Sequence, residues 1–330
     1  MKLAALLAAW LLTTFGAAAH AGDVGFTQLT VPDGNDKPLT VGVWYPTDAP
    51  ANPQALATFT QTVASGAPVA GAGLPLVVMS HGTGGWYGEH YDTALALAHA
   101  GFVVAALSHT GDTYQDHSQA LQIWKRPAQI HRLIDYMLAD WSGHAQIDPG
   151  RVGVFGFSAG GFTALVAAGG TADLTQVGPH CVKVPTAFEC GLVGKAAPEQ
   201  ADRPQPPRSA FVHDPRIKAA VVAAPALGFA FGREGLTGVR VPLQLWRAED
   251  DHLLPNPDYA QAVRDALPRP PEYHVVANAD HFDFLAPCNP GLAAAAPEIC
   301  VERPGFDRAA FHAEFDAAVV AFFEKTLAAD

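Results

Sequence analysis

The sequence is short of charge, and above all of positive charge. Asp, Glu, Lys and Arg make up 16% of the 330 residues, and 20 basic residues face 32 acidic ones, for a net charge of −12. A chain this acidic, with no cluster of Lys and Arg, is a poor nucleic-acid binder and a poor candidate for docking on anionic lipid. No internal repeat is visible. Hydrophobic residues, at 49%, exclude intrinsic disorder as the main state and supply a sizeable core.

Long hydrophobic runs are missing after the N-terminus, and the one at the N-terminus is short. Lys2 precedes an apolar run over residues 3–15, and Ala19-His20-Ala21 has the form of a signal-peptidase site. The run is shorter than the ~20 residues of a membrane anchor, which is the alternative. We therefore predict a cleaved signal peptide over residues 1–21. The mature chain, residues 22–330, is expected to form one domain that is periplasmic or secreted and has no transmembrane segment.

Cysteine is scarce, but its placement is informative. Cys181, Cys190, Cys288 and Cys300 all lie in the part predicted to be exported. An even count outside the reducing cytosol favours disulfides over the alternative of four free thiols. Three pairings are possible, and proximity in sequence favours Cys181–Cys190 and Cys288–Cys300. The spacings are not those of a zinc site, and none of the four is in a nucleophile motif.

Short apolar runs alternate with segments of helical spacing along most of the chain. The sequence predicts strands over residues 24–31, 39–45, 76–79, 102–107, 151–157, 217–223, 243–246 and 272–276, and helices over 91–100, 127–140, 159–168, 258–267 and 307–327. This order predicts an α/β fold with a mostly parallel, doubly wound sheet covered on both faces. Residues 49–73 are interpreted as a connection. Residues 170–215 lack a period and are interpreted as a lid-like insertion over the sheet.

A candidate nucleophile follows the predicted strand 151–157. Gly156-Phe157-Ser158-Ala159-Gly160 is a G-x-S-x-G pattern between a strand and a helix, and such a turn raises the Ser hydroxyl above the sheet. The alternative is an ordinary strand–helix turn with a capping Ser. The strand–turn–helix context favours the nucleophile.

A serine hydroxyl needs a base and an orienting acid, which in this arrangement follow it in the order acid, then His. After strand 243–246, three carboxylates compete in the segment Glu249-Asp250-Asp251. After strand 272–276 comes His281, the expected base, because it follows the last strand. Its main rival, His252, follows the wrong strand.

The first buried strand leads into His81-Gly82-Thr83-Gly84-Gly85. This is where such a fold places the second donor to an oxyanion, so we expect the backbone N–H groups of Thr83 and Ala159 to form the pair. His81 precedes two nearby glycines and is interpreted as a brace for the loop rather than a base.

These motifs together resemble the α/β-hydrolases of the dienelactone hydrolase-like and platelet-activating-factor acetylhydrolase-like group. The resemblance covers most of the mature chain, and its motifs are residues 43–46, 80–82 and 108–112, the Ser158 turn, the acid loop and the His281 loop. The family's acid loop has the pattern G-x-x-D-x-x-x-P. Alignment on Pro255 implies Asp251 rather than Asp250 as the acid, with Ala248 in place of the Gly.

Two departures from the family pattern matter. Dienelactone hydrolases proper use a Cys nucleophile where this chain has Ser158, so their particular substrate is not implied. The family's Gly before the His is Asp280 here, and its carboxylate is expected to tune His281.

Two further groups of residues are candidates. Four aromatic residues are expected to line a substrate pocket, although each could equally belong to the core or its rim: Trp86, Tyr87, Trp124 and Phe188. Four residues offer metal-ligand atoms but form no metal motif: His109, Asp112, Asp116 and His117. We expect no metal and no cofactor.

The sequence thus predicts an exported serine hydrolase that cleaves a small-molecule or lipid-like carboxylic ester through an acyl-enzyme. Amide or peptide hydrolysis by the same triad is an alternative. So is a non-catalytic binding protein on a hydrolase scaffold, because a fold does not fix a function. The oligomeric state is left open.

Overall fold

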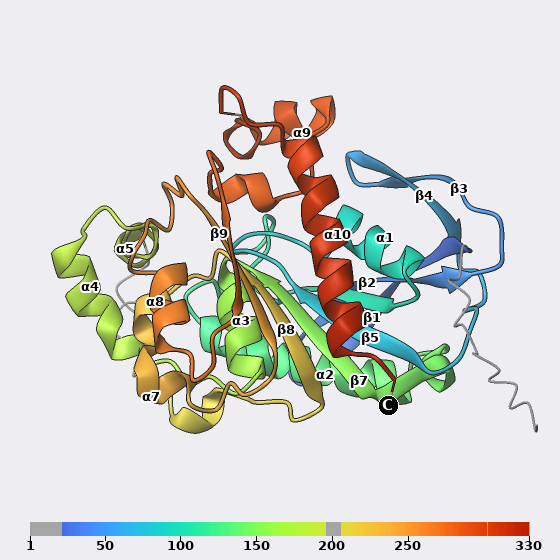
Figure 1. Cartoon of the computed structure of the whole chain (residues 1–330), viewed down its shortest axis with the longest axis horizontal. Coiled ribbons are helices and arrows are strands. Elements are labelled where there is room, and N and C mark those ends of the chain that lie inside the picture. Colours follow the sequence, from blue (N-terminus) through green and yellow to red (C-terminus); the bar gives the residue numbers. More distant parts are fainter. Residues whose placement is uncertain (1–21, 196–205, 302, 330) are drawn as a thin grey trace, which may run out of the picture.

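The computed structural model describes residues 22–195, 206–301 and 303–329 (Figure 1). The predicted signal peptide, residues 1–21, lies outside the described residues. Within the described ranges, no helix is long and apolar enough to cross a membrane.

A ten-stranded sheet runs through the described part of the chain in the order β10-β9-β8-β7-β5-β6-β2-β1-β4-β3. Its strands are β1 (Asp23–Asp33), β2 (Asp36–Thr47), β3 (Asn52–Leu56), β4 (Phe59–Ser65), β5 (Leu74–Ser80), β6 (Val103–Ser108), β7 (Ile147–Phe157), β8 (Ile217–Ala223), β9 (Leu243–Ala248) and β10 (Glu272–Val276). From β6 to β10 all neighbouring strands are parallel, whereas β2 pairs antiparallel with both β1 and β6. The predicted mostly parallel sheet is confirmed.

Helices cover both faces of this sheet (Figure 1). They are α1 (Tyr91–His99), α2 (Arg126–Ala139), α3 (Ala159–Ala167), α4 (Val177–Lys183), α5 (Phe188–Lys195), α7 (Gly232–Leu236), α8 (Ala260–Ala266), α9 (Pro290–Ala295) and α10 (Arg308–Thr326). Strand β7 shows why two layers form: Val152 and Val154 pack with α2 and α3, while Phe155 and Phe157 pack with α1 and α10. Because successive strand residues point to opposite faces, a wholly apolar strand requires a core on each side. This is the α/β-hydrolase fold.

The interpretation of residues 49–73 as a connection is wrong, because they contain the hairpin β3–β4. Strand β4 alternates between buried and exposed residues over its first five positions. One of its inward positions is Gln61, whose Oε1 accepts a hydrogen bond from Trp44 Nε1 at 2.8 Å. A buried polar residue interrupts the apolar alternation by which such a strand is recognised.

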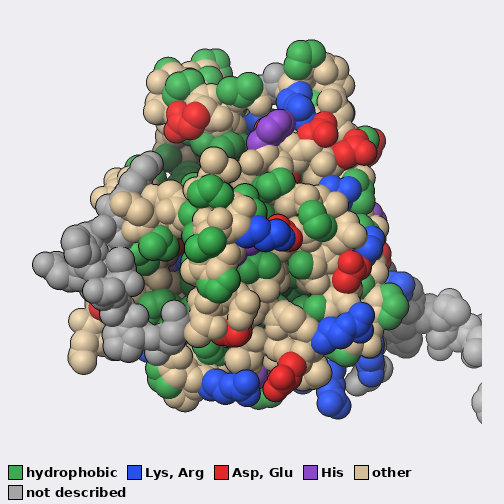
Figure 2. All heavy atoms as spheres, turned by 90° about the vertical axis from the view of Figure 1, so that its left-hand side faces the viewer, with side chains coloured by type: hydrophobic (Ala, Val, Ile, Leu, Met, Phe, Trp, Pro, Cys, Tyr) green, Lys and Arg blue, Asp and Glu red, His purple; other side chains and the backbone are tan. Residues whose placement is uncertain are grey.

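The predicted insertion, residues 170–215, contains α4 and α5, which are joined by the disulfide Cys181–Cys190. Residues 196–205 of this insertion lie outside the described residues. Both helices lie on the left of Figure 1, and Figure 2 turns this side to the viewer. Hydrophobic side chains are visible at many points of this face (Figure 2). A second disulfide, Cys288–Cys300, closes the segment around α9.

Candidate active site

Ser158 stands at the junction of β7 and α3 in a strained conformation, with φ 55° and ψ −116°. A non-glycine residue with positive φ costs about 1–3 kcal/mol, which the surrounding structure has to offset. Its backbone is held on both sides: Ser158 N–H donates to Ala223 O at 2.9 Å, and Ser158 O accepts from Ala226 N–H at 2.9 Å. A Cβ at Gly156 would collide with the Gly160 carbonyl, and one at Gly160 with the Ser80 carbonyl. Both glycines are therefore required by close backbone approach.

The turn brings Ser158 into a hydrogen-bonded chain with the predicted base and acid. Ser158 Oγ lies 3.0 Å from His281 Nε2, and His281 Nδ1 lies 2.8 Å from Asp251 Oδ2. A carboxylate only accepts hydrogen bonds, so the ring proton is on Nδ1 and Nε2 is free to accept from the serine hydroxyl. All three residues are buried. Asp250 instead pairs with Arg303 at 2.6 Å, on the protein surface.

The loop after β9 fixes the Asp251 carboxylate. Asp251 Oδ1 accepts from Leu253 N–H at 3.0 Å and from Leu254 N–H at 2.6 Å, which leaves Oδ2 for His281. The Asp280 side chain forms hydrogen bonds with the His281 backbone and with His252, rather than with the imidazole of His281. Its Oδ1 accepts from the backbone N–H groups of His281 and His252, and its Oδ2 lies 3.0 Å from the His252 ring. Burial acts to raise the pKa of Asp280, but these N–H donors hold it below its usual value.

His281 begins a short 3₁₀ turn, His281–Phe284, and two side chains of α10 hold this turn by hydrogen bonds. Asp283 in this turn accepts from Asp280 N–H at 2.7 Å. On its other side, Asp283 accepts from Arg308 Nε at 3.1 Å, and both side chains are about 1% exposed. His312 Nε2, one turn further along α10, lies 3.0 Å from the Asp283 carbonyl oxygen. Sequence reasoning missed Arg308 and His312, because no local pattern marks a partner about 25 residues away.

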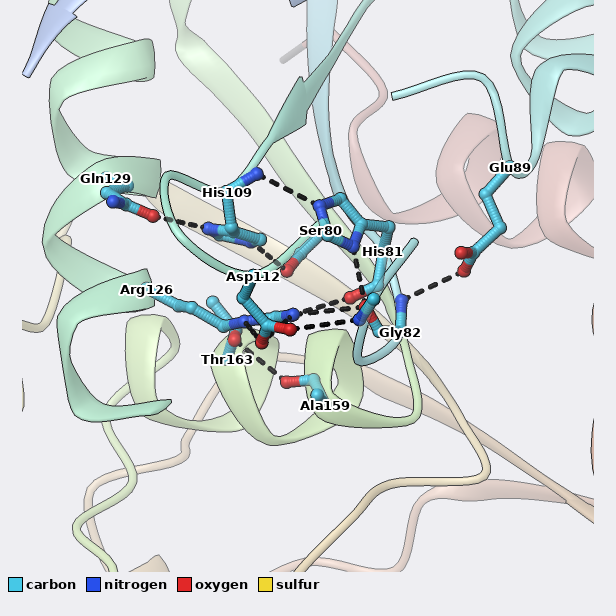
Figure 3. A network of polar contacts seen from close by, with 11 residues as sticks. Ser80, His81, Gly82, Glu89, His109, Asp112, Arg126, Gln129, Ala159 and Thr163 are labelled. Carbon is cyan, nitrogen blue, oxygen red and sulfur yellow. Dashed lines mark hydrogen bonds and ion pairs between the residues drawn. The ribbon is translucent and has the colours of Figure 1, made fainter. Parts of the chain in front are cut away.

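The loop with the expected oxyanion donor is held by a buried arginine (Figure 3). Arg126, at the start of α2, donates to the carbonyl oxygens of His81 at 2.7 Å and Gly82 at 3.0 Å. Its guanidinium also pairs with Asp112 at 2.6 Å, and Asp112 accepts from Gly84 N–H at 2.9 Å. On the opposite side, Gly82 N–H donates to Glu89 at 2.9 Å. These bonds fix the backbone on both sides of Thr83.

Ala159 is the first residue of α3, and N–H groups in the first turn of a helix have no partner within that helix. Its N–H is therefore available to a ligand next to Ser158. Thr83 lines the cavity described below. Sequence reasoning placed both residues at this site but missed Arg126 and Glu89, which hold the loop.

His81 and His109 act as neutral braces (Figure 3). His109 N–H donates to His81 Nε2 at 2.9 Å, so the proton of His81 is on Nδ1, which donates to Gly82 O at 2.6 Å. Burial, aided by the charge of Arg126, lowers the pKa of His81 to about 4. His109 lies between the Ser80 hydroxyl at 2.7 Å and Gln129 Oε1 at 2.6 Å, and burial lowers its pKa well below the usual range. The interpretation of His81 as a brace agrees with these contacts.

A cavity of about 490 Å³ lies between the Thr83 loop, the segment before α2, and helices α4 and α5. Its lining includes Ala226 and Leu254, whose N–H groups donate to Ser158 O and Asp251 Oδ1, so it adjoins these two residues. Trp124 and Phe188 are among the residues that line it. Trp86 and Tyr87 are not among its lining residues: they pack against each other, and Tyr87 also packs against the buried Trp44. Trp86 and Tyr87 therefore belong to the rim of the core, which was the stated alternative.

The four possible metal ligands of the sequence do not converge on a site in the described ranges. His109 and Asp112 are engaged as above, and Asp116 pairs with Lys37. A different group, Asp92, His312 and Asp316, has its ligand atoms within 4.8 Å of one another and has the composition to hold a metal ion.

Protein contacts already occupy this group, which joins α1 to α10. His312 Nδ1 lies 2.7 Å from Asp92, and Asp316 accepts from the Thr93 hydroxyl at 2.6 Å. Burial, and then the charge of Asp92, raise the pKa of Asp316 to about 7. Burial acts to lower the pKa of His312, but the Asp92 carboxylate holds it above its usual value. The contact between the two helices therefore favours the protonated forms of Asp316 and His312.

Comparison with known proteins adds to this picture. Residues 62–180 match the model of the dienelactone hydrolase family, a stretch that contains the Thr83 loop and Ser158 but ends before Asp251 and His281. The fold is similar to that of a ferulic acid esterase from Streptomyces cinnamoneus, with a TM-score of 0.64 and 20% sequence identity over 95% of this chain and 92% of that one. Among curated proteins, none matches the sequence significantly. The chain therefore has the α/β-hydrolase fold, and its residues 62–180 are similar to the dienelactone hydrolase family.

Proposed function

We propose that this protein is a serine esterase that hydrolyses carboxylic esters through an acyl-enzyme. The observation that carries the proposal is the chain of hydrogen bonds from Ser158 Oγ to His281 Nε2 at 3.0 Å, and from His281 Nδ1 to Asp251 Oδ2 at 2.8 Å. Its spacing matches what nucleophilic catalysis by serine requires. The cavity next to it supplies room for a substrate.

In the first half-reaction, Ser158 Oγ attacks the ester carbonyl carbon while His281 Nε2 takes the hydroxyl proton. The carbonyl oxygen becomes an oxyanion, which the N–H groups of Thr83 and Ala159 stabilise. Asp251 stabilises the imidazolium and holds its ring in place. The C–O bond to the alcohol then breaks, His281 returns the proton to the leaving alcohol, and the acyl group stays on Ser158.

In the second half-reaction, water attacks the acyl-enzyme and gives its proton to His281. The new tetrahedral intermediate collapses, the proton returns to Ser158 Oγ, and the carboxylic acid leaves. Apart from the ester and one water molecule, each step uses groups that the chain itself provides.

A fluorophosphonate probe tests the nucleophile directly. The wild-type protein should be labelled on Ser158 and should hydrolyse p-nitrophenyl acetate, while Ser158→Ala should show neither labelling nor more than a residual rate. A wild-type protein that is not labelled would favour the non-catalytic binding role. Turnover of p-nitroanilides at rates comparable with the esters would favour the amidase alternative.

We further propose that the protein acts outside the cytoplasm after removal of residues 1–21. Two disulfides between cysteines close in sequence support this, because disulfides persist in oxidising compartments. N-terminal sequencing of the protein recovered from the producing cell should begin at Gly22. Retention of residues 1–21 in a membrane fraction would instead indicate an anchor.

A further inference from the structure

The cavity beside Ser158 is apolar almost throughout, and one buried carboxylate interrupts it. Trp124, Phe188 and Leu192 contribute hydrophobic surface, and Thr83 and Leu254 lie toward the triad. Its volume of about 490 Å³ falls in the range of ordinary small-molecule sites, about 300–1,000 Å³. Among the described residues that line it, Glu189 is the one with an ionisable carboxylate.

Glu189 is held firmly by groups behind the cavity wall. The Tyr259 hydroxyl donates to its carboxylate, at 2.9 Å from Oε1 and 3.1 Å from Oε2, and His180 Nε2 lies 3.3 Å from Oε1. Burial and the charge of Glu189 raise the pKa of Tyr259, so its hydroxyl stays protonated and remains a donor. The neighbouring Cys190 is tied to Cys181 of α4. The carboxylate therefore has a fixed position before any ligand enters.

These contacts do not use all the acceptor capacity of the carboxylate. A carboxylate has about four acceptor positions, and Tyr259 supplies one hydrogen while His180 supplies at most one. A buried polar group is costly unless its hydrogen-bonding capacity is met. Because Glu189 lines the cavity, a molecule inside it is placed to supply a further donor.

We propose that Glu189 selects esters whose cavity-bound part is apolar and carries a hydroxyl group, with the carboxylate accepting the hydroxyl hydrogen. A neutral hydroxyl should bind at this carboxylate more favourably than an ammonium group. An ammonium would lose most of its hydration to reach a single carboxylate that is already shared with Tyr259. This inference rests on the proposed esterase function and specifies its substrate class.

The test compares pairs of substrates that differ only in a hydroxyl or a methyl group of similar size. p-Nitrophenyl 3-(4-hydroxyphenyl)propanoate and its 4-methyl analogue place the group on the acyl side. 4-Hydroxybenzyl and 4-methylbenzyl acetates place it on the alcohol side. For wild type, the hydroxyl compound of at least one pair should have a kcat/KM higher by about 10-fold or more, as expected of a hydrogen bond to a charged group.

Two variants separate recognition from structural support. In Tyr259→Phe, Glu189 loses its donor but stays in the cavity, so the hydroxyl preference should persist or increase. In the double variant Glu189→Leu/Tyr259→Phe, both partners of the buried hydrogen bond are removed together, which avoids leaving either one unsatisfied. Its hydroxyl-to-methyl ratio should fall to about one. Glu314→Leu, on the exposed side of α10, is the matched control and should keep the wild-type ratio.

The proposal is overturned if wild type shows no hydroxyl preference on either side, if the double variant keeps the preference, or if an ammonium analogue is preferred to the hydroxyl compound. Equal loss of preference in Tyr259→Phe and in the double variant would also overturn it, because that would assign Glu189 to folding alone. Fluorophosphonate labelling and acetate hydrolysis of wild type report on the proposed esterase function separately. A labelled, active enzyme with no hydroxyl preference would refute this inference and leave that function standing.

Discussion

Replacing Asp251 by Asn changes the one group that faces His281 Nδ1, and so tests whether Asp251 fixes the tautomer of His281. Asp251 Oδ1 accepts from the backbone N–H groups of Leu253 and Leu254, and Oδ2 faces His281 Nδ1 at 2.8 Å. An Asn side chain has one oxygen, and the two backbone donors will retain it. Its NH₂ group then points at His281 Nδ1, where the wild-type protein has an acceptor.

A donor opposite Nδ1 stabilises the other tautomer of the imidazole, with the proton on Nε2. In that tautomer, Nε2 faces Ser158 as a donor and cannot take the hydroxyl proton. The same change in a serine-protease triad costs about 10⁴ in kcat, or about 5.4 kcal/mol in the barrier. We expect a loss of this size in Asp251→Asn, with KM changed by no more than a few fold. The shape of the side chain is nearly unchanged, so the free energy of unfolding should fall by about 1 kcal/mol at most.

Asp250→Asn is the matched control, one residue away and chemically identical. Its carboxylate pairs with Arg303 at the surface, and its side chain is 44% exposed, so the change should alter kcat less than about threefold. Steady-state hydrolysis of p-nitrophenyl acetate measures both variants, and thermal unfolding followed by circular dichroism checks the fold. The reasoning is refuted if Asp251→Asn retains more than a tenth of kcat, or if Asp250→Asn loses as much.

Three further predictions follow from the same structure. Arg126→Met should lower kcat by about 10² by releasing the Thr83 loop, and it should also destabilise the fold by leaving Asp112 unpaired. The double variant Asp112→Asn/Arg126→Met should regain stability in a denaturant titration but not kcat; recovery of both would show that the loop needs no such support. Asp316→Asn should stabilise the protein more at pH 8 than at pH 5. The pKa of Asp316 is raised to about 7 in the folded protein, so the stability that its protonated form contributes declines as pH rises from about 4 through about 7. The free energy of unfolding lost in this way is about 4 kcal/mol at most. Equal shifts in Tm at both pH values would contradict this. Peptide mapping without reductant should find the Cys181–Cys190 and Cys288–Cys300 bridges and no free thiol, and a bridge between the two pairs would disprove the local pairing.

The sheet and the order of the site residues could be predicted because their signals are local. A strand such as β5, buried on both faces, appears in the sequence as an unbroken apolar run. The turn at Ser158 has glycines at positions where backbones touch. The choice of Asp251 as the proposed acid required an alignment on Pro255, since the segment Glu249-Asp250-Asp251 offers three carboxylates and periodicity does not distinguish among them.

The supporting residues could not be predicted because their partners are distant in sequence. Arg126 lies 44 residues from Gly82, one of the carbonyl groups that it holds. Nothing near Arg126 distinguishes it from a surface arginine at a helix N-terminus. The same reason left the positions of Trp86 and Tyr87 open, because their aromatic character suits a cavity wall as well as a core rim. Only the three-dimensional fold determines whether such a residue lies in a cavity wall, at the rim of the core or at the surface.

The two halves of the proposed catalytic site come from different parts of the chain, and α1 and α10 join them. Ser158 and the Thr83 loop lie within residues 62–180, whereas Asp251 and His281 lie beyond. Just before α1, Glu89 accepts from Gly82 N–H with its side chain, and its carbonyl accepts from Ala286 N–H, two residues after the His281 turn.

From the other side, Arg308 and His312 of α10 hold Asp283 within that turn, and His312 also contacts Asp92 of α1. A shift of α10 against α1 would therefore move His281 relative to Ser158. A displacement of about 1 Å at reacting groups can cost about 10² in rate. The packing of α10 on α1 thus supports the geometry of the proposed catalytic site, although neither helix contributes a residue to the proposed triad.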